Sequence, residues 1–443
     1  MGYSLVIDCY EPLRKVQFLL DSLQIQADLL THWYPGWDFT RDGDNTWKQY
    51  SQLAQPKKIM FWYSPFTNDI TNSYTPSSRD FTLYWLHNNL QQAHLQQPRF
   101  YITLQTWGTK NLNSGEYESY MYPTPEEISA ETMLSLAHGV TGIFYETYYS
   151  FYQNDEYSTV NEALVNLPVG NPPSVTITPT DRWYKVQQLA ERLNGTLGKT
   201  LMTLNYTATD ETNGFLMLRR NVHEPTGASE SLNYLTLSTN TEDQPINFHA
   251  GFFTNSSQPS SNYFLLTNQI VTENRTVNIE VTDNFAGVNN MRFRNIEPDN
   301  NFDITFTGSY STDYDFPAGE GYLFQVAPVA IYGGKLIYDE YVNTDITLYD
   351  DMTIENGATL TLDANYYCKG NITIKDGGSI KTVNGATIQF ESGKKLIIEG
   401  LATVKGTSTH KLTLDFNDPN DNTGIEVLTD GDFTASKKLM LLK

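Results

Sequence analysis

The chain has 443 residues, more than one ordinary hydrophobic core accommodates, and its 29 Lys and Arg against 51 Asp and Glu give a formal net charge of −22. The acidic residues are scattered along the chain, which argues against nucleic acid or an anionic membrane as a partner. No apolar run approaches the roughly 20 residues of a membrane-spanning helix, so we expect no membrane insertion.

The chain begins MGYSLVIDCYEPL, which lacks the basic region and apolar core of a secretory signal. Because this start is strand-like from the third residue, we expect the chain to be a fragment that opens within a fold. Its two cysteines, Cys9 and Cys368, fall in different predicted domains. That separation argues against a disulfide and excludes a thiolate metal site.

The first 200 residues or so alternate strand and helix patterns. Apolar segments predict strands at residues 3–10, 28–34, 58–63, 100–107 and 140–149. Helical spacing predicts helices at residues 13–23, 77–95, 125–138 and 181–193. The third helix has clear ends, because Thr124 is a plausible N-cap, Pro125 takes the first position, Glu127 completes a capping box and Gly139 follows the last turn.

Five strands that alternate with helices predict a parallel sheet with right-handed crossovers. A closed TIM barrel needs eight such units, so residues 1–198 are either a barrel that lacks about three amino-terminal units or an open α/β layer. We favour the partial (β/α)8 barrel, because the strand ends carry Tyr, Trp, Gln and Glu. A glycine-rich phosphate loop, which would indicate a nucleotide fold, is absent from the sequence.

Residues 199–330 lose the helical period and predict a β-sandwich. Eight segments alternate apolar and polar residues there: LMTLNYTA, GFLMLRR, NYLTLST, INFHAGFF, NYFLLTN, RTVNIEVTD, FDITFTG and GYLFQVAPV. Residues 331–443 instead repeat short β segments around polar corners, with Gly357, Gly377 and Gly393 spaced by 20 and 16 residues. This repeat predicts the start of a β-solenoid of the right-handed parallel β-helix type, with a second ordinary β-sandwich as the alternative.

Strand alternation predicts which side chains share the inner face of the barrel. In residues 100–107, Ile102 and Leu104 should face the helices, which leaves Tyr101, Thr103, Gln105 and Trp107 pointing inward. In residues 140–149 the same alternation groups Phe144, Glu146 and Tyr148. Because a charged side chain belongs at a solvated mouth, Glu146 is the leading candidate acid.

The first two predicted strands bring further polar and aromatic side chains to the same end of the sheet. Asp8 shares a face with Tyr10, and Glu11 follows at the end of the first strand. The second strand ends at Pro35-Gly36, around which four side chains cluster: His32, Tyr34, Trp37 and Asp38.

Sugars need flat aromatic faces and polar groups for their hydroxyls, and 13% of the residues are aromatic, although Tyr is also common in ordinary strands. Glycosidic hydrolysis also needs two carboxyls, about 5 to 5.5 Å apart for retention and roughly 6.5 to 9.5 Å for inversion. The catalytic candidates are Glu146, Asp8, Glu11 and Asp38. The sugar-binding candidates are Gln105, Trp107, Tyr148, Tyr34, Trp37, His32 and Tyr10. For each carboxyl the alternative is a solvated loop acid or a structural hydrogen-bond partner.

Other chemistry has little support in the sequence. The seven histidines form no HxH or HExxH spacing and no GxSxG elbow is present, so we expect neither a metal nor another cofactor. His138, in the last turn of its helix, fits a helix-terminus role better than catalysis.

The run PTPEEISAETMLSLAHGVTGIFYETYYSF, preceded by LQTWG, resembles the last two βα units of bacterial carbohydrate-active TIM barrels of the glycosidase superfamily. The segment DFPAGEGYLFQVAPV looks like the last strand of the β-sandwich that commonly follows such barrels, and the tail resembles the parallel β-helix appendages of secreted bacterial surface proteins. These resemblances imply a polysaccharide or oligosaccharide as partner and an extracellular or cell-surface location, with an export signal upstream of Met1.

One departure from the resembled family concerns catalysis. Many retaining members carry a nucleophilic Glu at the end of the seventh strand, where this sequence has Gln105 or Trp107. An amide cannot act as a carboxylate nucleophile. Three alternatives remain open. The nucleophilic carboxylate comes from another strand, or it belonged to the barrel units that are missing from this chain, or the barrel binds sugar without cleaving it.

The sequence leaves three alternative functions open. The first is a glycoside-hydrolase-like protein, its close alternative is a non-catalytic carbohydrate-binding or adhesive cell-surface protein, and the third is a TIM-barrel enzyme for a non-sugar substrate. Hydrolysis requires a pair among the four candidate carboxyls within about 10 Å of each other across one cleft. Nothing in the pattern indicates an oligomeric state.

Overall fold

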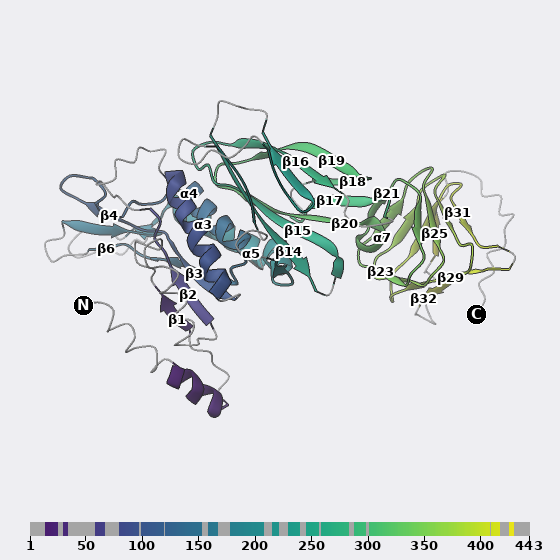
Figure 1. Ribbon diagram of the computed structural model, residues 1–443, viewed down its shortest axis with the longest axis horizontal. Helices are drawn as coiled ribbons and strands as arrows, with labels where there is room; N and C mark the ends of the chain where they lie inside the picture. The colour runs from purple at the N-terminus through teal and green to yellow at the C-terminus, as the bar shows by residue number, and fades with distance from the viewer. Residues whose placement is uncertain are drawn as a thin grey trace. The chain divides into compact units, whose positions relative to one another are not determined.

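Figure 1 shows a computed structural model of the chain, which divides into two compact units. The structure describes residues 14–24, 30–33, 58–66, 79–96, 99–118, 120–152, 158–166, 178–207, 215–220, 229–239, 245–256, 258–282, 288–297, 301–407, 409–416 and 425–428. Unit 1 comprises Met1–Ser257, Tyr263–Ile279 and Thr312–Leu323. Unit 2 comprises Gln258–Asn262, Glu280–Ser311 and Phe324–Lys443. The three predicted domains, 1–198, 199–330 and 331–443, stay a prediction.

The amino-terminal part of unit 1 contains a four-stranded parallel sheet. Its strands are β1 (Leu30–Trp33), β2 (Lys58–Trp62), β3 (Phe100–Gln105) and β5 (Gly142–Glu146). They pair in parallel in the order β1-β2-β3-β5, which is chain order, as expected when each crossover leads to the neighbouring strand. The predicted strand at residues 3–10 lies outside the described residues.

Helices α3 (Arg79–Gln96) and α4 (Pro125–Ala137) cover one face of this sheet (Figure 1). The buried core between them contains Ile59, Phe61, Leu86, Leu90, Ile102, Leu104, Ala130 and Leu134. The predicted ends of α4 are confirmed, since Thr124 and Glu127 form the reciprocal hydrogen bonds of a capping box. Residues 14–22 are also helical, as predicted. Among the described residues, no helix is long and apolar enough to cross a membrane.

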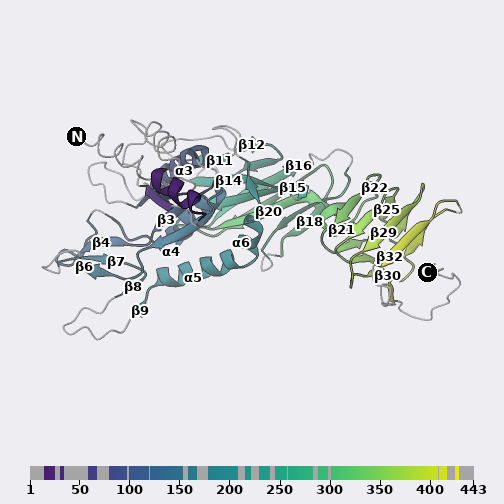
Figure 2. The ribbon, with the colours of Figure 1, turned by 90° about the horizontal axis from the view of Figure 1, so that it is seen from below.

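Short strands that the sequence did not indicate extend from the carboxyl ends of β3 and β5 (Figure 2). They form a three-stranded sheet, β4-β7-β6, and a two-stranded sheet of β8 and β9. Their bounds are β4 (Gly108–Asn111), β6 (Phe151–Tyr152), β7 (Thr159–Glu162), β8 (Val165–Asn166) and β9 (Thr178–Pro179). The chain then enters α5 (Asp181–Asn194), capped by Thr180, and α6 (Thr196–Leu201).

Two further sheets are built from strands between residues 205 and 328, and every pair of known direction in them is antiparallel. One has the order β10-β14-β15-β20-β17-β18, with β11 also on β14, and the other is β12-β13-β16-β19. The strands are β10 (Asn205–Tyr206), β11 (Phe215–Arg220), β12 (Ser229–Leu232), β13 (Leu235–Ser238), β14 (Ile246–Asn255), β15 (Gln258–Asn268), β16 (Arg275–Thr282), β17 (Met291–Asn295), β18 (Asp303–Phe306), β19 (Ser309–Phe316) and β20 (Gly321–Pro328). The prediction missed β12, β17 and β19, and it was wrong for the start of LMTLNYTA, where Leu201 ends α6.

The tail beyond residue 328 contains a short helix, α7 (Val329–Tyr332), and three parallel sheets. Their orders are β21-β24-β27-β30-β33, β22-β25-β28-β31 and β23-β26-β29-β32. The strands are β21 (Gly334–Leu336), β22 (Glu340–Val342), β23 (Ile346–Leu348), β24 (Met352–Ile354), β25 (Thr359–Leu362), β26 (Tyr366–Cys368), β27 (Ile372–Ile374), β28 (Ser379–Lys381), β29 (Ala386–Phe390), β30 (Leu396–Glu399), β31 (Thr403–Lys405), β32 (Leu412–Phe416) and β33 (Ile425–Leu428). Equivalent positions pair in register, as Met352 does with Ile372. The predicted corner residues Gly357, Gly377 and Gly393 have φ of 84°, 77° and 79°.

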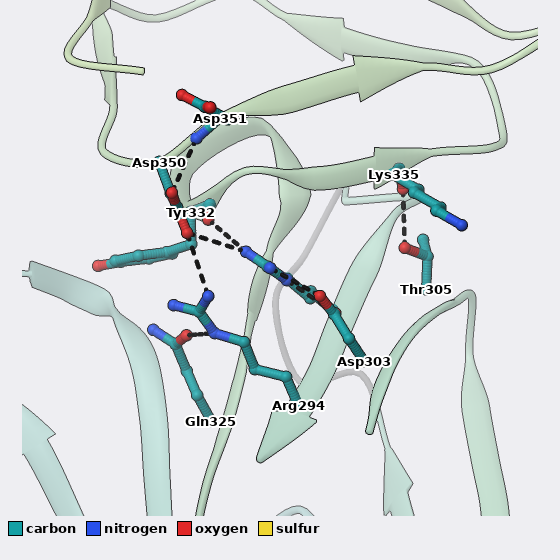
Figure 3. Close-up of polar contacts among 9 residues, drawn as sticks. Arg294, Asp303, Thr305, Gln325, Tyr332, Lys335, Asp350 and Asp351 are labelled. Carbon is teal, nitrogen blue, oxygen red and sulfur yellow. Dashed lines mark hydrogen bonds and ion pairs between the residues drawn. The ribbon is translucent and has the colours of Figure 1, made fainter. Parts of the chain in front are cut away.

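Within unit 2, two arginines of β17 hold the start of the tail (Figure 3). The guanidinium of Arg292 donates to both carboxylate oxygens of Asp303, at 2.9 and 2.7 Å, and to the carbonyl oxygen of Tyr332 at 2.9 Å. The guanidinium of Arg294 donates to Asp350 at 3.1 Å. These charge-assisted contacts fix α7 and the turn after β23 against β17 and β18.

Candidate functional site

Strand β5 presents two different faces, as its alternation predicts. Ile143 and Tyr145 pack against the core under α3 and α4. Phe144 points the other way and is 47% exposed. Glu146 shares the face of Phe144 and ends the strand, so its carboxyl lies at the carboxyl edge of the parallel sheet.

The carboxyl of Glu146 is half-buried and incompletely hydrogen-bonded. Its Oε2 is buried and has no hydrogen-bond partner among the described residues. Burial raises the pKa of this carboxyl above its usual value, and a contact with the indole of Trp62 offsets part of the rise. Register places Trp62 beside Thr103 and Thr103 beside Phe144, so all three lie on one face. A carboxyl with a raised pKa can donate a proton or accept a hydroxyl hydrogen bond.

Gln105 pairs with Glu146 across the sheet, but its side chain is completely buried. Its amide nitrogen donates to the carbonyl oxygens of Phe66, Trp107 and Met121 at 3.1, 2.9 and 3.0 Å. Its amide oxygen accepts from the backbone N–H of Phe66 at 3.0 Å. The amide therefore holds together the chain segments after β2, after β3 and before α4, and no part of it is exposed to a ligand.

The indole of Trp107 is 7% exposed and lies under the loop that follows β4. Its ring centroid is 4.6 Å from that of Tyr120. Its Nε1 is buried and has no hydrogen-bond partner among the residues that the structure describes. Trp107 thus lines the inside of the strand-end region rather than its surface.

Exposed aromatic rings follow Glu146 in the chain. Tyr148 and Tyr149 are 51% and 53% exposed, and the ring of Tyr148 lies 5.6 Å from the ring of Trp183 in the first turn of α5. We call Tyr148, Tyr149 and Trp183 the aromatic cluster. Tyr148 was among the predicted sugar-binding residues, whereas Trp183 was not, because no local pattern connects it with the end of β5.

Polar contacts fix the backbone around this cluster. The hydroxyl of Tyr117 donates to Glu162, which also accepts from Lys110 at 3.5 Å. Burial and then the contact with Glu162 raise the pKa of Tyr117. The guanidinium of Arg182 lies 3.7 Å from the ring centroid of Tyr122. These contacts connect the loop before α4 with β7 and α5.

Several predicted site residues lie outside the described residues: Asp8, Tyr10, Glu11, Tyr34, Trp37 and Asp38. His32 is placed only by its backbone in β1, where it pairs with Met60. The separation between Glu146 and a second candidate carboxyl therefore stays a prediction. In the part of the chain that the structure describes, no group of His, Cys, Asp or Glu could hold a metal ion.

No family model matches the sequence, and no curated protein matches it. Among solved structures, a family 51 α-L-arabinofuranosidase from Bifidobacterium longum is similar with a TM-score of 0.32 and 9% identity, over 71% of this chain and 62% of that chain. A family 44 xyloglucanase from Paenibacillus polymyxa has a TM-score of 0.29 and 9% identity, over 74% of this chain and 61% of that chain. The chain thus spans less than two thirds of the length of either protein.

Proposed function

We propose that the chain is a carbohydrate-active, glycoside-hydrolase-like protein that binds an extracellular polysaccharide at the carboxyl edge of its parallel sheet. The observation that carries this proposal is Glu146, a half-buried carboxyl with one unpartnered oxygen that is followed in the chain by exposed aromatic rings. A sugar needs this combination, because its C–H face stacks on an aromatic ring while its hydroxyls need hydrogen-bond partners.

The side chains take different roles in this proposal. Tyr148 supplies the stacking surface, with Trp183 packed against its ring. Glu146 accepts a hydroxyl hydrogen bond or, in hydrolysis, protonates the leaving oxygen, for which its raised pKa is suitable. Gln105 positions the surrounding loops and does not touch the sugar.

The proposal includes a fold and a location. Residues 1–198 form a partial TIM barrel, followed by a β-sandwich and a parallel β-helix-like tail in a protein of the cell exterior. Its support is the chain-order parallel sheet, the antiparallel sheets of the middle region and the in-register parallel strands of the tail. The proposed location rests on the resemblances of residues 123–151, of the end of the middle domain and of the tail.

A non-catalytic, carbohydrate-binding or adhesive protein is the second candidate. It is favoured by the absence of a carboxylate at the expected position of a retaining nucleophile, which Gln105 or Trp107 occupies. Both the nitrogen and the oxygen of the Gln105 amide form hydrogen bonds with the backbone. Hydrolysis then depends on a second carboxyl, for which Asp8, Glu11 and Asp38 are the proposed candidates.

The test measures binding and hydrolysis by the full chain on a panel of polysaccharides. Tyr148→Ala should weaken binding roughly three- to tenfold, because a stacked aromatic contact is worth about 0.5 to 1.5 kcal/mol. If the protein is catalytic, Glu146→Gln should lower the rate of hydrolysis by about 10² or more and leave binding nearly intact.

Tyr367→Ala is the matched control, since Tyr367 is 41% exposed but lies on β26 in the tail. Binding without hydrolysis in the wild type would select the non-catalytic candidate. If neither Tyr148→Ala nor Glu146→Gln changes binding or hydrolysis, the proposal that the sugar binds at the sheet edge beside Glu146 is wrong.

A further inference from the structure

The sheet β22-β25-β28-β31 of the tail presents two in-register rows of outward side chains. Register aligns one row of Tyr341, Thr361, Lys381 and Lys405, and a second row of Thr359, Ser379 and Thr403. The side chains between them, such as Leu360 and Ile380, are completely buried in the tail core. This face is therefore polar, with one exposed aromatic ring at its first strand, where Tyr341 is 50% exposed.

Lys381 and Lys405 are direct neighbours on this face. Adjacent strands lie about 4.8 Å apart, so like charges on directly paired residues are unfavourable, and an anion bound between the two side chains would relieve the repulsion. Elsewhere in the tail Lys375 pairs with Glu399 at 2.9 Å, but within the described residues no ion pair involves Lys381 or Lys405. The arrangement thus leaves two adjacent positive charges without a partner on a protein of net charge −22.

The acid beside this face, Asp363, is engaged elsewhere. It accepts hydrogen bonds from the backbone N–H groups of Val383 and Asn384 at 2.9 and 3.0 Å. These backbone bonds, that of Asn384 first, lower the pKa of Asp363 to about 2. Asp363 also accepts from the hydroxyl of Tyr341 at 2.9 Å, which fixes the orientation of that ring at the end of its row.

We propose that this face binds a linear anionic polysaccharide whose sugars carry carboxylates. Lys381 and Lys405 bind the carboxylates, the hydroxyls of Thr361, Ser379 and Thr403 bind sugar hydroxyls, and the ring of Tyr341 stacks on a sugar. In an extended glycan the spacing between successive sugar rings is close to the spacing between adjacent strands. Successive sugars can therefore contact successive strands of this sheet.

The same observations disfavour nucleic acid as the ligand. A nucleic acid duplex carries denser charge than a polyuronate, so the acidic chain repels it more strongly. For a single strand, this face offers two lysines and one aromatic ring rather than a basic groove with several stacking rings. The proposal is independent of the function proposed for the Glu146 edge, because Glu146 belongs to unit 1 and this sheet to unit 2.

The test is affinity electrophoresis of the full chain at low ionic strength in gels that contain polygalacturonate, alginate or hyaluronan. The wild type should be retarded by at least one of them, and methyl esterification of that polysaccharide should abolish the retardation. The double variant Lys381→Gln/Lys405→Gln should bind roughly tenfold more weakly or worse, because it loses two charge-assisted contacts. Added salt should weaken wild-type binding.

Lys335→Gln/Lys369→Gln is the charge-matched control, because Lys335 lies on β21 and Lys369 directly follows β26, and these strands belong to the other two sheets of the tail. This control should bind as the wild type does, and thermal unfolding should show that every variant is folded. Retardation by none of the three polyuronates would overturn the proposal. So would an equal loss in the charge-matched control, or equal binding to a duplex DNA fragment that depends on the same two lysines.

Discussion

Glu131 on α4 is fully buried, and neither carboxyl oxygen accepts a hydrogen bond of ordinary geometry from the described residues. Burial raises the pKa of this carboxyl well above 4.5, and the nearby backbone N–H of Gln105 offsets only part of the rise. The folded protein therefore keeps this proton at pH values where the unfolded chain has released it. The contribution of Glu131 to the free energy of unfolding consequently falls as the pH rises above about 4.5.

We predict that Glu131→Gln raises the free energy of unfolding at neutral pH, because the amide has no proton to lose. Its advantage over the wild type should grow by about 1.4 kcal/mol per pH unit between the unfolded and the folded pKa. Urea unfolding at about pH 4, 5.5 and 7 measures this difference. Tryptophan fluorescence reports on unit 1, because all seven tryptophans lie within Met1–Ser257.

Glu126→Gln is the matched control for this prediction, since Glu126 is half-exposed on the same helix. It should show no comparable growth of its effect with pH. A difference between Glu131→Gln and the wild type that stayed constant across the three pH values would contradict the expected ionisation of Glu131.

At the scale of single residues, strand alternation correctly predicted the face of the sheet on which a side chain lies, but it did not predict what that side chain contacts. Ile102 and Leu104 are buried against the helices, and Phe144 and Glu146 share the opposite face, as expected. Gln105 occupies its expected position in β3, but loops from residues 66 and 121 fold over its amide. Such a cover depends on residues far away in the sequence, so a local pattern cannot reveal it.

At the scale of elements, the cap of α4 can be tested directly. The side chain of Thr124 accepts from the backbone N–H of Glu127 at 3.2 Å, and the carboxylate of Glu127 accepts from the backbone N–H of Thr124 at 2.7 Å. Thr124→Ala removes the first of these bonds and should lower the free energy of unfolding by about 1 kcal/mol. Thr124→Ser should restore most of the loss.

Urea unfolding of unit 1 followed by tryptophan fluorescence measures the effect of Thr124→Ala. Thr196→Ala serves as control, because Thr196 is exposed at the start of α6, whose N-cap makes no side-chain hydrogen bond. A loss as large in the control as in Thr124→Ala would rule out the cap as the cause.

Helices whose ends are marked by capping residues in the adjacent sequence were predicted. Strands whose side chains contact residues elsewhere in the chain were in part missed. The ends of α4 depend on residues adjacent in sequence, and they are confirmed. Strand β17, which was missed, carries Arg292 and Arg294, and no local pattern connects them with their ion-pair partners Asp303 and Asp350. Strand β14 was predicted from the segment INFHAGFF, although the structure buries it on both faces and it therefore lacks the burial alternation of a half-exposed strand.

At the scale of the molecule, unit 1 is held together by contacts that sequence patterns do not contain. A Cβ at Gly251 of β14 would lie 1.7 Å from the carbonyl oxygen of Ala137, so α4 packs directly on the β14 backbone. Glu320 accepts from Ser129 at 3.0 Å and pairs with Lys185 at 2.8 Å and Arg192 at 2.7 Å. These contacts join α4, α5 and the turn before β20 across more than 120 residues of sequence.

The same packing buries three histidines between α3, α4 and β14. Nδ1 of His87 lies 2.9 Å from Nε2 of His138, and the rings of His87 and His249 are 5.2 Å apart. Burial first, and then the charge of Arg219, lower the pKa of His87 from 6.5 to about 3. Burial also lowers the pKa of His138 and His249, and His94 on α3 adds to the effect on His138.

A histidine whose folded pKa is lowered stays neutral while the unfolded chain takes up a proton. The contribution of each such histidine to the free energy of unfolding of unit 1 should therefore fall by about 1.4 kcal/mol per pH unit as the pH drops from about 6.5 towards about 3, opposite in sign to the contribution of Glu131. His87→Asn keeps a polar atom near His138 but cannot be protonated, so it should reduce this slope by the share of one histidine. Urea unfolding between about pH 4 and 6, followed by tryptophan fluorescence, gives the change in the free energy of unfolding per pH unit, which is this slope.

His410→Asn, at an exposed position in the tail, is the control and should leave the slope unchanged. If His87→Asn also leaves it unchanged, His87 is protonated in the folded protein, and the three buried rings are not the neutral cluster that their packing requires.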